Sequence, residues 1–296
     1  MRWKRLIVLI CFLLILGWAT DIKGKIGLTE NKGPSLAVVS AALMDAETGR
    51  WLYLSNAQEP LPPASMSKMM TEVLVLDSIK SGEFGWKDSV VVSDYAANVG
   101  GAAMELTSGQ AITVEELFNA MAVHSANDAA VALSEFASGS ESLFVKRMNT
   151  KAEEIGMSPN SHFANSTGLS SADLISYEAA ASNGETMLTA KDVAILARYL
   201  IETHPEILKI TKQSTVSTSA SGKLETTNEM LPGQRFGTRG NDGLKTGFTQ
   251  KAGYCFTGTT VMDGRRYITV VMGAVTPESR FEETKKLLEY GAGISS

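Results

Sequence analysis

The sequence has few of the residues that bind metals or form disulfides. Its 296 residues include two cysteines and three histidines. Cys11 lies in the apolar N-terminal segment, so removal of that segment leaves Cys255 alone and excludes an intrachain disulfide. The histidines lie far apart and do not have the spacing of zinc ligands. We therefore expect no metal site and no cofactor.

Charged residues are also few, at 20% of the chain, and the formal net charge is −5. No long basic run follows the N-terminus, which argues against a protein that binds nucleic acid. The low charged fraction also argues against a disordered chain. The hydrophobic content of 44% is enough to fill the core of one or two domains. The composition therefore predicts a folded, acidic protein.

The N-terminus has the three parts of a secretory signal peptide. Three basic residues among the first five precede the apolar run 6–18, and Gly17 and Ala19 are small residues at the positions that a signal peptidase reads. We expect a signal peptide over residues 1–19, a linker over 20–34 and one folded domain over 35–296. The apolar run is short for a membrane span of about 20 residues, but an uncleaved N-terminal anchor is the alternative. Either way, the protein is expected to be exported.

Predicted strands lie at both ends of the chain and predicted helices lie between them, which favours an α+β fold. The N-terminal hairpin and a C-terminal meander should form one antiparallel five-stranded sheet, flanked by helices and by a helical subdomain. Asp263-Gly264 predicts a hairpin turn between the last two strands. The expected strands are 36–44, 50–54, 243–249, 253–262 and 266–274, and the expected helices are 64–81, 113–123, 127–136, 142–155, 189–202 and 277–290.

The first candidate site is Ser65-Met66-Ser67-Lys68, at the start of a predicted helix. Residues i and i+3 share a helix face, so the Ser65 hydroxyl and the Lys68 amine can touch. A serine becomes a strong nucleophile when a base takes its proton, and a lysine can be that base when burial or a second cation lowers its pKa. Taken alone, the pattern is more typical of a helix-capping serine followed by a solvated lysine.

Two further motifs strengthen the first. Ser125-Ala126-Asn127 lies in a break between helices, where a hydroxyl and an amide can reach a cleft, although both residue types also cap helices. Lys245-Thr246-Gly247 lies on a predicted strand, although lysine and glycine are poor strand formers. Glycine there indicates close approach of a ligand or another backbone, and the lysine can supply the second cation. The alternative, without a functional role, is an edge strand with an exposed lysine.

Together the three motifs match the S-x-x-K, S-x-N and K-T-G pattern of penicillin-binding proteins and class A β-lactamases, in the expected order and structural contexts. Longer stretches, 63–71, 100–104, 113–130, 165–169, 244–253 and 280–281, resemble the low-molecular-mass penicillin-binding proteins of the D-alanyl-D-alanine carboxypeptidase family. The resemblance covers roughly residues 35–291. It implies the β-lactamase/transpeptidase-like fold and a serine peptidase that removes the terminal D-alanine from peptidoglycan stem peptides.

The resemblance also implies roles for individual residues. Ser65 is the expected nucleophile, Lys68 takes its proton, and Ser125, helped by Lys245, relays a proton to the departing D-alanine. β-Lactam antibiotics are expected to acylate Ser65 as substrate mimics. The backbone N–H groups of Ser65 and Phe248 are expected to form an oxyanion hole. The expected substrate-binding residues are Asn127, Lys245, Thr246, Gly247, Phe248 and Arg280.

Other functions on the same fold are a β-lactamase, a cross-link endopeptidase and a wall-peptide or β-lactam sensor. The stretch 158–171 contains no glutamate to activate a deacylating water, and Ala126 stands where β-lactamases have aspartate, which makes a β-lactamase the least favoured. The intact motifs argue against a sensor without activity, whereas an endopeptidase would use the same residues. The sequence ends soon after the last predicted helix, so we expect no C-terminal membrane anchor.

Overall fold

The computed structural model describes residues 33–181 and 184–295, so the predicted signal peptide lies outside the described residues. The chain divides into two compact units, Met1–Ser35 and Leu36–Ser296, and the fold is that of the second unit. Within the described ranges, no helix combines the length and the apolar character needed to cross a membrane.

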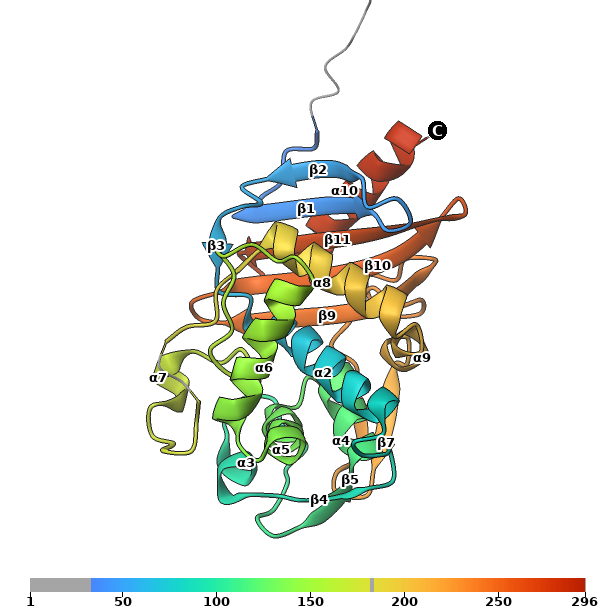
Figure 1. Ribbon diagram of the computed structural model, residues 1–296. Helices are drawn as coiled ribbons and strands as arrows, with labels where there is room; N and C mark the ends of the chain where they lie inside the picture. Colours follow the sequence, from blue (N-terminus) through green and yellow to red (C-terminus); the bar gives the residue numbers. More distant parts are fainter. Residues whose placement is uncertain (1–32, 182–183, 296) are drawn as a thin grey trace, which may run out of the picture. The chain divides into compact units, whose positions relative to one another are not determined.

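A five-stranded antiparallel sheet forms the upper layer of this unit in Figure 1, as predicted. Its order is β2-β1-β11-β10-β9, so the N-terminal hairpin pairs with the C-terminal meander through β1 and β11. Asp263 and Gly264 both have positive φ, as a type I′ hairpin turn requires. The strands are β1 (Ser40–Asp45), β2 (Trp51–Ser55), β9 (Asn241–Thr249), β10 (Gly253–Met262) and β11 (Arg265–Ala274).

Alternating side chains of the sheet pack on two different helical layers. Ala41 and Leu43 of β1 join a core with the last helix, α10 (Ser279–Ser295), whereas Ala42 and Met44 face the main core on the other side. Helix α8 (Ala190–Thr203) crosses that second face. Figure 1 shows α8 in front of the sheet and α10 behind it.

The helical subdomain lies beside β9, the strand at one end of the sheet. Its central helix, α2, is buried over most of its surface and is followed by Gly82, whose φ of 79° suits a left-handed C-cap. The predicted capping box is present: Thr113 accepts from the Glu116 N–H, and the Glu116 carboxylate accepts from Thr113. The helices are α2 (Lys68–Ser81), α4 (Val114–Asn119), α5 (Asn127–Ser138) and α6 (Glu141–Glu154).

Several short elements were not predicted because two to five residues are too few to show a period. The helix expected over 113–123 ends at Asn119 and continues as a wide turn, η2 (Ala120–His124). The last helix begins at Ser279 and extends past residue 290. The other elements are β3 (Pro60–Leu61), β4 (Ser89–Val91), β5 (Ala111–Thr113), β6 (Leu188–Thr189), β7 (Thr215–Thr218), β8 (Gly222–Glu225), η1 (Ala64–Ser67), α3 (Asp94–Asn98), α7 (Ser171–Leu174) and α9 (Ile207–Thr211).

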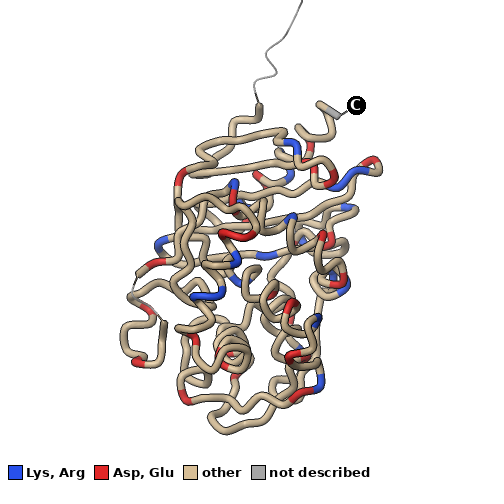
Figure 2. Tube along the Cα trace, viewed as in Figure 1, with Lys and Arg blue, Asp and Glu red and all other residues tan. Residues whose placement is uncertain are grey.

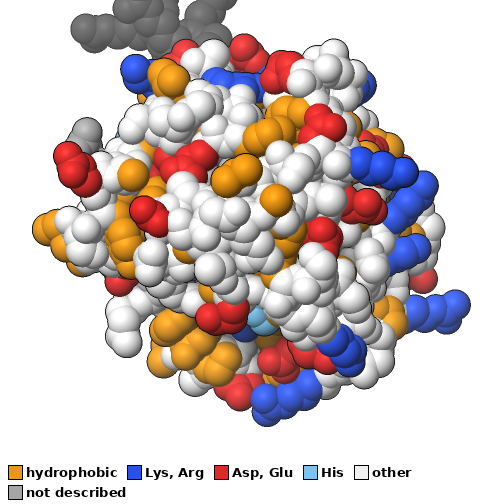
Figure 3. All heavy atoms as spheres, turned by 90° about the horizontal axis from the view of Figure 1, so that it is seen from below, with side chains coloured by type: hydrophobic (Ala, Val, Ile, Leu, Met, Phe, Trp, Pro, Cys, Tyr) orange, Lys and Arg blue, Asp and Glu red, His pale blue; other side chains and the backbone are white. Residues whose placement is uncertain are grey.

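Acidic and basic residues are interspersed along the described chain (Figure 2). From below, acidic and hydrophobic side chains are mixed, and lysines and arginines lie mostly along one side (Figure 3). The buried charged residues of the unit, by contrast, include Lys68, Glu72, Asp128 and Lys245, around the junction of α2, α5 and β9. This junction therefore has the buried charged groups that acid–base chemistry uses.

Candidate active site

Ser65 and Lys68 meet at the start of α2. Ala64–Ser67 forms a 3₁₀ turn, η1, that leads directly into the helix. Lys68 Nζ lies 2.9 Å from Ser65 Oγ, 2.6 Å from Asn127 Oδ1 and 2.7 Å from the Thr167 carbonyl oxygen. Lys68 is fully buried, whereas Ser65 is partly exposed. The amine is thus held against a hydroxyl that a substrate can reach.

The environment favours the neutral form of the amine. Burial and then the charge of Lys245 lower the pKa of Lys68 well below its usual value, against opposite effects of Glu72 and Asp128. Burial also lowers the pKa of Lys245 to about 8, while Glu72 raises it and Arg280 lowers it. The charge of Lys245 thus adds to burial in making Lys68 a better proton acceptor than an exposed lysine.

Ser125 and Asn127 lie at the break between η2 and α5, and Asn127 contacts Lys68. Ser125 is buried and has a φ of 71°, a left-handed conformation that is costly for a non-glycine residue. Asn127 begins α5, and its side chain bonds in two directions: Oδ1 accepts from Lys68, and Nδ2 donates to the Gly100 carbonyl 2.7 Å away. In this structure Asn127 therefore holds Lys68 in place.

Strand β9 brings the third motif alongside Ser65. A Cβ added to Gly247 would lie 2.6 Å from the Pro63 carbonyl oxygen and 3.2 Å from the Ser65 nitrogen, so only glycine allows this approach. Lys245 is buried, and the Thr246 hydroxyl donates to Thr227 Oγ1 at 2.6 Å. The close approach of backbone predicted from the glycine is confirmed.

The remaining two predicted residues are Phe248, on β9, and Arg280, on α10. Phe248 is 46% exposed and stacks on Tyr254 of β10, with ring centroids 4.3 Å apart. The Arg280 guanidinium lies over the Tyr254 ring at 5.6 Å and within 3.5 Å of the Gly247 carbonyl oxygen. Its Nε is buried and has no hydrogen-bond partner among the described residues. All three motifs and Arg280 thus converge on one region.

Sequence reasoning assigned no role to the segment 165–169, although it belongs to the resemblance. Asn165 Oδ1 accepts from the Thr167 N–H at 3.1 Å and the Gly168 N–H at 2.6 Å, which fixes the turn that presents the Thr167 carbonyl to Lys68. A backbone acceptor has no side-chain signature, so the only available signal was the Asn-Ser-Thr-Gly-Leu stretch itself. The sequence also gave no indication that Glu72 is buried and that its charge acts on Lys68.

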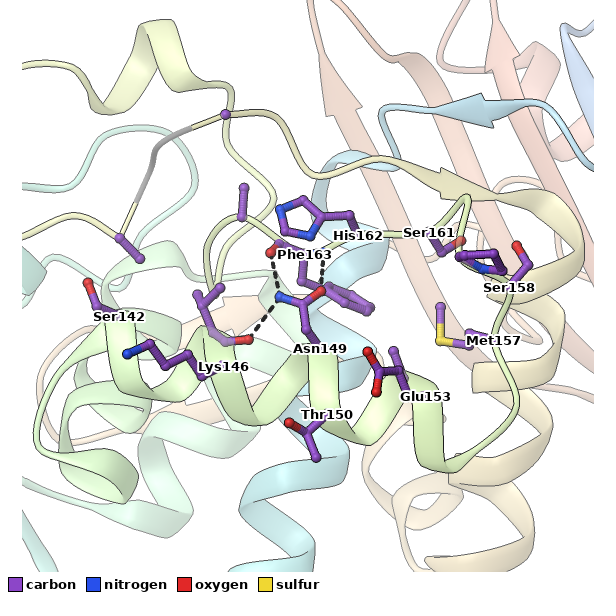
Figure 4. A pocket seen from close by; sticks show the side chains of 16 residues that line it. Ser142, Lys146, Asn149, Thr150, Glu153, Met157, Ser158, Ser161, His162 and Phe163 are labelled. Carbon is purple, nitrogen blue, oxygen red and sulfur yellow. Dashed lines mark hydrogen bonds between the residues drawn. The ribbon is translucent and has the colours of Figure 1, made fainter.

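A cavity of about 950 Å³ lies elsewhere, along α6 and the segments that follow it (Figure 4). None of the nine predicted site residues is among its lining residues. Asn149, in its middle, already bonds to the backbone of Phe163 and Val145. Within residues 33–181 and 184–295, no cluster of three or more His, Cys, Asp or Glu side chains could hold a metal ion.

A family model described as D-alanyl-D-alanine carboxypeptidase matches residues 28–276. The chain belongs to this family. It is 38% identical over 255 residues to the D-alanyl-D-alanine carboxypeptidase DacF of Bacillus subtilis, a match that spans 85% of this chain and 61% of that protein. It is also 27% identical over 293 residues to a D-alanyl-D-alanine endopeptidase of Pseudomonas aeruginosa, covering 97% of this chain and 88% of that protein.

Solved structures show the same fold and family. Penicillin-binding protein D2 of Listeria monocytogenes, in its ampicillin-bound form, is 37% identical, with a TM-score of 0.73 over 88% of this chain and 99% of that one. A peptidoglycan synthesis regulatory factor of Streptococcus pneumoniae, also 37% identical, has a TM-score of 0.82 over 87% of this chain and 74% of that one. The predicted α+β fold with a five-stranded sheet is thereby confirmed.

Proposed function

We propose that this chain is a serine-type D-alanyl-D-alanine carboxypeptidase that removes the terminal D-alanine from peptidoglycan stem peptides. The observation that carries the proposal is the 2.9 Å contact between Lys68 Nζ and Ser65 Oγ. Asn127 Oδ1 and the Thr167 carbonyl only accept hydrogen bonds, so they take the two N–H groups of a neutral amine. The lone pair of the amine is then left for the Ser65 hydroxyl.

In the proposed first step, Ser65 Oγ attacks the carbonyl carbon between the two D-alanines, and its proton passes to Lys68 Nζ. The negative charge on the carbonyl oxygen is stabilised by the backbone N–H groups of Ser65 and Phe248. The C–N bond breaks, and Ser125, assisted by Lys245, delivers a proton to the nitrogen of the departing D-alanine. Water then attacks the ester on Ser65, which releases the shortened peptide and restores the serine.

Recognition of the terminal carboxylate is assigned to Lys245, Thr246 and Arg280. Charge-assisted hydrogen bonds to a carboxylate are strong where water is excluded, and both cations are almost fully buried. Gly247 lets β9 lie close to the Ser65 turn, so the proposed substrate site lies between these two segments. Asn127 Nδ2 donates to the Gly100 carbonyl, so its proposed contact with the substrate requires that bond to open.

The same site is proposed to react with β-lactams, which would acylate Ser65 and stay attached. The Listeria relative was solved with ampicillin bound. Because peptidoglycan lies outside the cytoplasmic membrane, the proposal includes export directed by the predicted signal peptide over residues 1–19. The chain spans 61% of the length of its Bacillus relative, so the activity of the whole protein is part of the proposal.

A cross-link endopeptidase is the second candidate, because the Pseudomonas relative carries that name and matches nearly the whole chain. The two activities use the same nucleophile and differ in whether the leaving group is a free D-alanine or a side chain of another stem peptide. A sensor without turnover or a β-lactamase has no such support.

The test is D-alanine release by the purified protein from a peptide ending in D-Ala-D-Ala. Ser65→Ala should abolish release, whereas Ser67→Ala should retain it, because the buried Ser67 hydroxyl has no hydrogen-bond partner among the described residues. If folded wild-type protein released no D-alanine, the proposed carboxypeptidase activity would be wrong. Cleavage of cross-linked dimers would then indicate the endopeptidase, and penicillin binding without either cleavage would indicate a sensor.

A further inference from the structure

Glu141 is a buried carboxylate that the proposed reaction does not use. It is the first residue of α6 and is fully buried. Its Oε1 accepts from the Ser166 N–H at 2.9 Å and from the Ser166 hydroxyl at 2.6 Å. Its Oε2 accepts from the Tyr95 hydroxyl at 3.0 Å and from the Ala181 N–H at 2.9 Å. These four donors compensate for the cost of burying the carboxylate, and two of them belong to one residue next to the site.

Ser166 is held on both sides. Glu141 accepts from its N–H and its hydroxyl, and the Ser166 carbonyl oxygen accepts from Thr71 Oγ1 at 2.9 Å. Thr71 follows Lys68 by three residues on α2, so the two side chains share a face of that helix. Ser166, itself fully buried, is therefore fixed between the start of α6 and the helix that carries the proposed base.

The next residue along the chain completes the connection to Lys68. The Thr167 carbonyl oxygen accepts from Lys68 Nζ at 2.7 Å. Asn165 shapes this turn from within, whereas Glu141 attaches the turn to α6. Hydrogen bonds and one peptide bond thus form a continuous path from Glu141 through Ser166 and Thr167 to the amine.

We propose that Glu141 is a positioning residue that keeps the Thr167 carbonyl on Lys68 Nζ. This inference rests on the proposed function and extends it. The carbonyl takes one N–H of the amine and so leaves the lone pair for the Ser65 hydroxyl. If Ser166 shifts, that N–H loses its acceptor, the amine can rotate, and its lone pair no longer points at the hydroxyl. The expected defect is in proton removal from Ser65 and not in substrate binding.

The test measures acylation of Ser65 by a fluorescent penicillin in single-turnover experiments. Glu141→Leu removes both acceptor oxygens, and we expect the acylation rate constant to fall by about tenfold or more. Glu141→Gln should restore most of the rate, because the amide oxygen can still accept from Ser166 and the amide nitrogen can donate to the Tyr95 hydroxyl. The matched control is Tyr95→Phe, which removes a donor from the other carboxylate oxygen and should acylate at close to the wild-type rate. An unchanged rate in Glu141→Leu, or an equal loss in Tyr95→Phe, would overturn the inference.

A second readout separates positioning of the base from a general loss of structure. Binding of a D-Ala-D-Ala peptide, measured by calorimetry in the Ser65→Ala background, should have the same Kd with and without Glu141→Leu. A Kd that rises as much as the acylation rate falls would show that the whole site is disturbed, and the positioning role would be wrong.

These outcomes are separable from that of the proposed function. Acylation by penicillin does not require release of D-alanine, so it still decides if the wild type is an endopeptidase or a sensor. If Glu141→Leu does not fold, Ser166→Ala decides, because it removes the hydroxyl bond to Glu141 and should also slow acylation; an unchanged rate would contradict the proposal. If the wild type is not acylated, a crystal structure of Glu141→Leu should show the Thr167 carbonyl away from Lys68 Nζ, and an intact contact would refute the inference.

Discussion

Replacing Gly247 by alanine should strongly slow the acylation of Ser65 and should lower the stability of the protein only moderately. The added methyl would lie 2.6 Å from the Pro63 carbonyl oxygen, which is backbone and cannot rotate away. Strand β9 or the Ser65 turn must therefore move by about 0.5 Å to reach an acceptable contact. Since β9 is an edge strand, next to β10 in the sheet order, the strand is the element that gives way.

This movement separates the backbone N–H groups of Ser65 and Phe248, which are proposed to stabilise the same oxyanion. Loss of one such donor costs about 10²- to 10³-fold in rate. We expect a loss of this size in single-turnover acylation by a fluorescent penicillin. Overpacking should lower the free energy of unfolding by only about 1–3 kcal/mol, measured in urea.

The matched control is Gly293→Ala in α10, where an added methyl meets no atom within 4 Å. It should leave both acylation and stability near wild-type values or slightly raise stability. If Gly247→Ala acylated within threefold of the wild-type rate while folded, the close approach of β9 to Ser65 would not be needed for catalysis and the proposed oxyanion hole would be wrong.

Two further predictions concern the cation and the acceptor around Lys68. The pKa of Lys245 is lowered to about 8, so its cation is present below that pH and lost above it. Above that pH, kcat/KM for a D-Ala-D-Ala peptide should therefore fall about tenfold per pH unit. A profile that stays flat to about pH 10 would contradict this role of Lys245. Asn165→Ala removes the acceptor that shapes the turn before Gly168, so the Thr167 carbonyl should move away from Lys68. The rate of Ser65 acylation should then fall by about tenfold or more. An unchanged rate would show that Asn165 is not needed to position Lys68.

Predictions from the sequence were good where a residue type has one strong local preference. The Thr113–Glu116 pair predicted a capping box, and Asp263-Gly264 predicted a hairpin turn, and both are present. Strand and helix periods likewise predicted the sheet that joins the two ends of the chain. Elements such as β4 and β5, with three residues each, are set by their partners and carry no period of their own.

The site was predictable only in part, for a related reason. Ser65, Lys68 and Lys245 form a side-chain pattern that can be read along the chain. The proton-holding environment cannot be read in this way, because it depends on burial and on a backbone carbonyl from Thr167, 99 residues away. Glu72 looked like an ordinary helix residue, because the sequence does not show that it is buried and that its charge acts on Lys68.

Two glycines explain why these distant segments can meet at Ser65. A Cβ on Gly168 would lie 2.1 Å from the Ala64 carbonyl oxygen, and one on Gly247 would lie 2.6 Å from that of Pro63. The turn before the nucleophile is thus enclosed by two backbones that approach without side chains. Ala64 itself has a φ of 49°, a costly conformation for alanine that persists only where the surroundings enforce it. The glycines therefore contribute to the site together with the motif residues, because a side chain at either position would displace the backbone of the Ser65 turn.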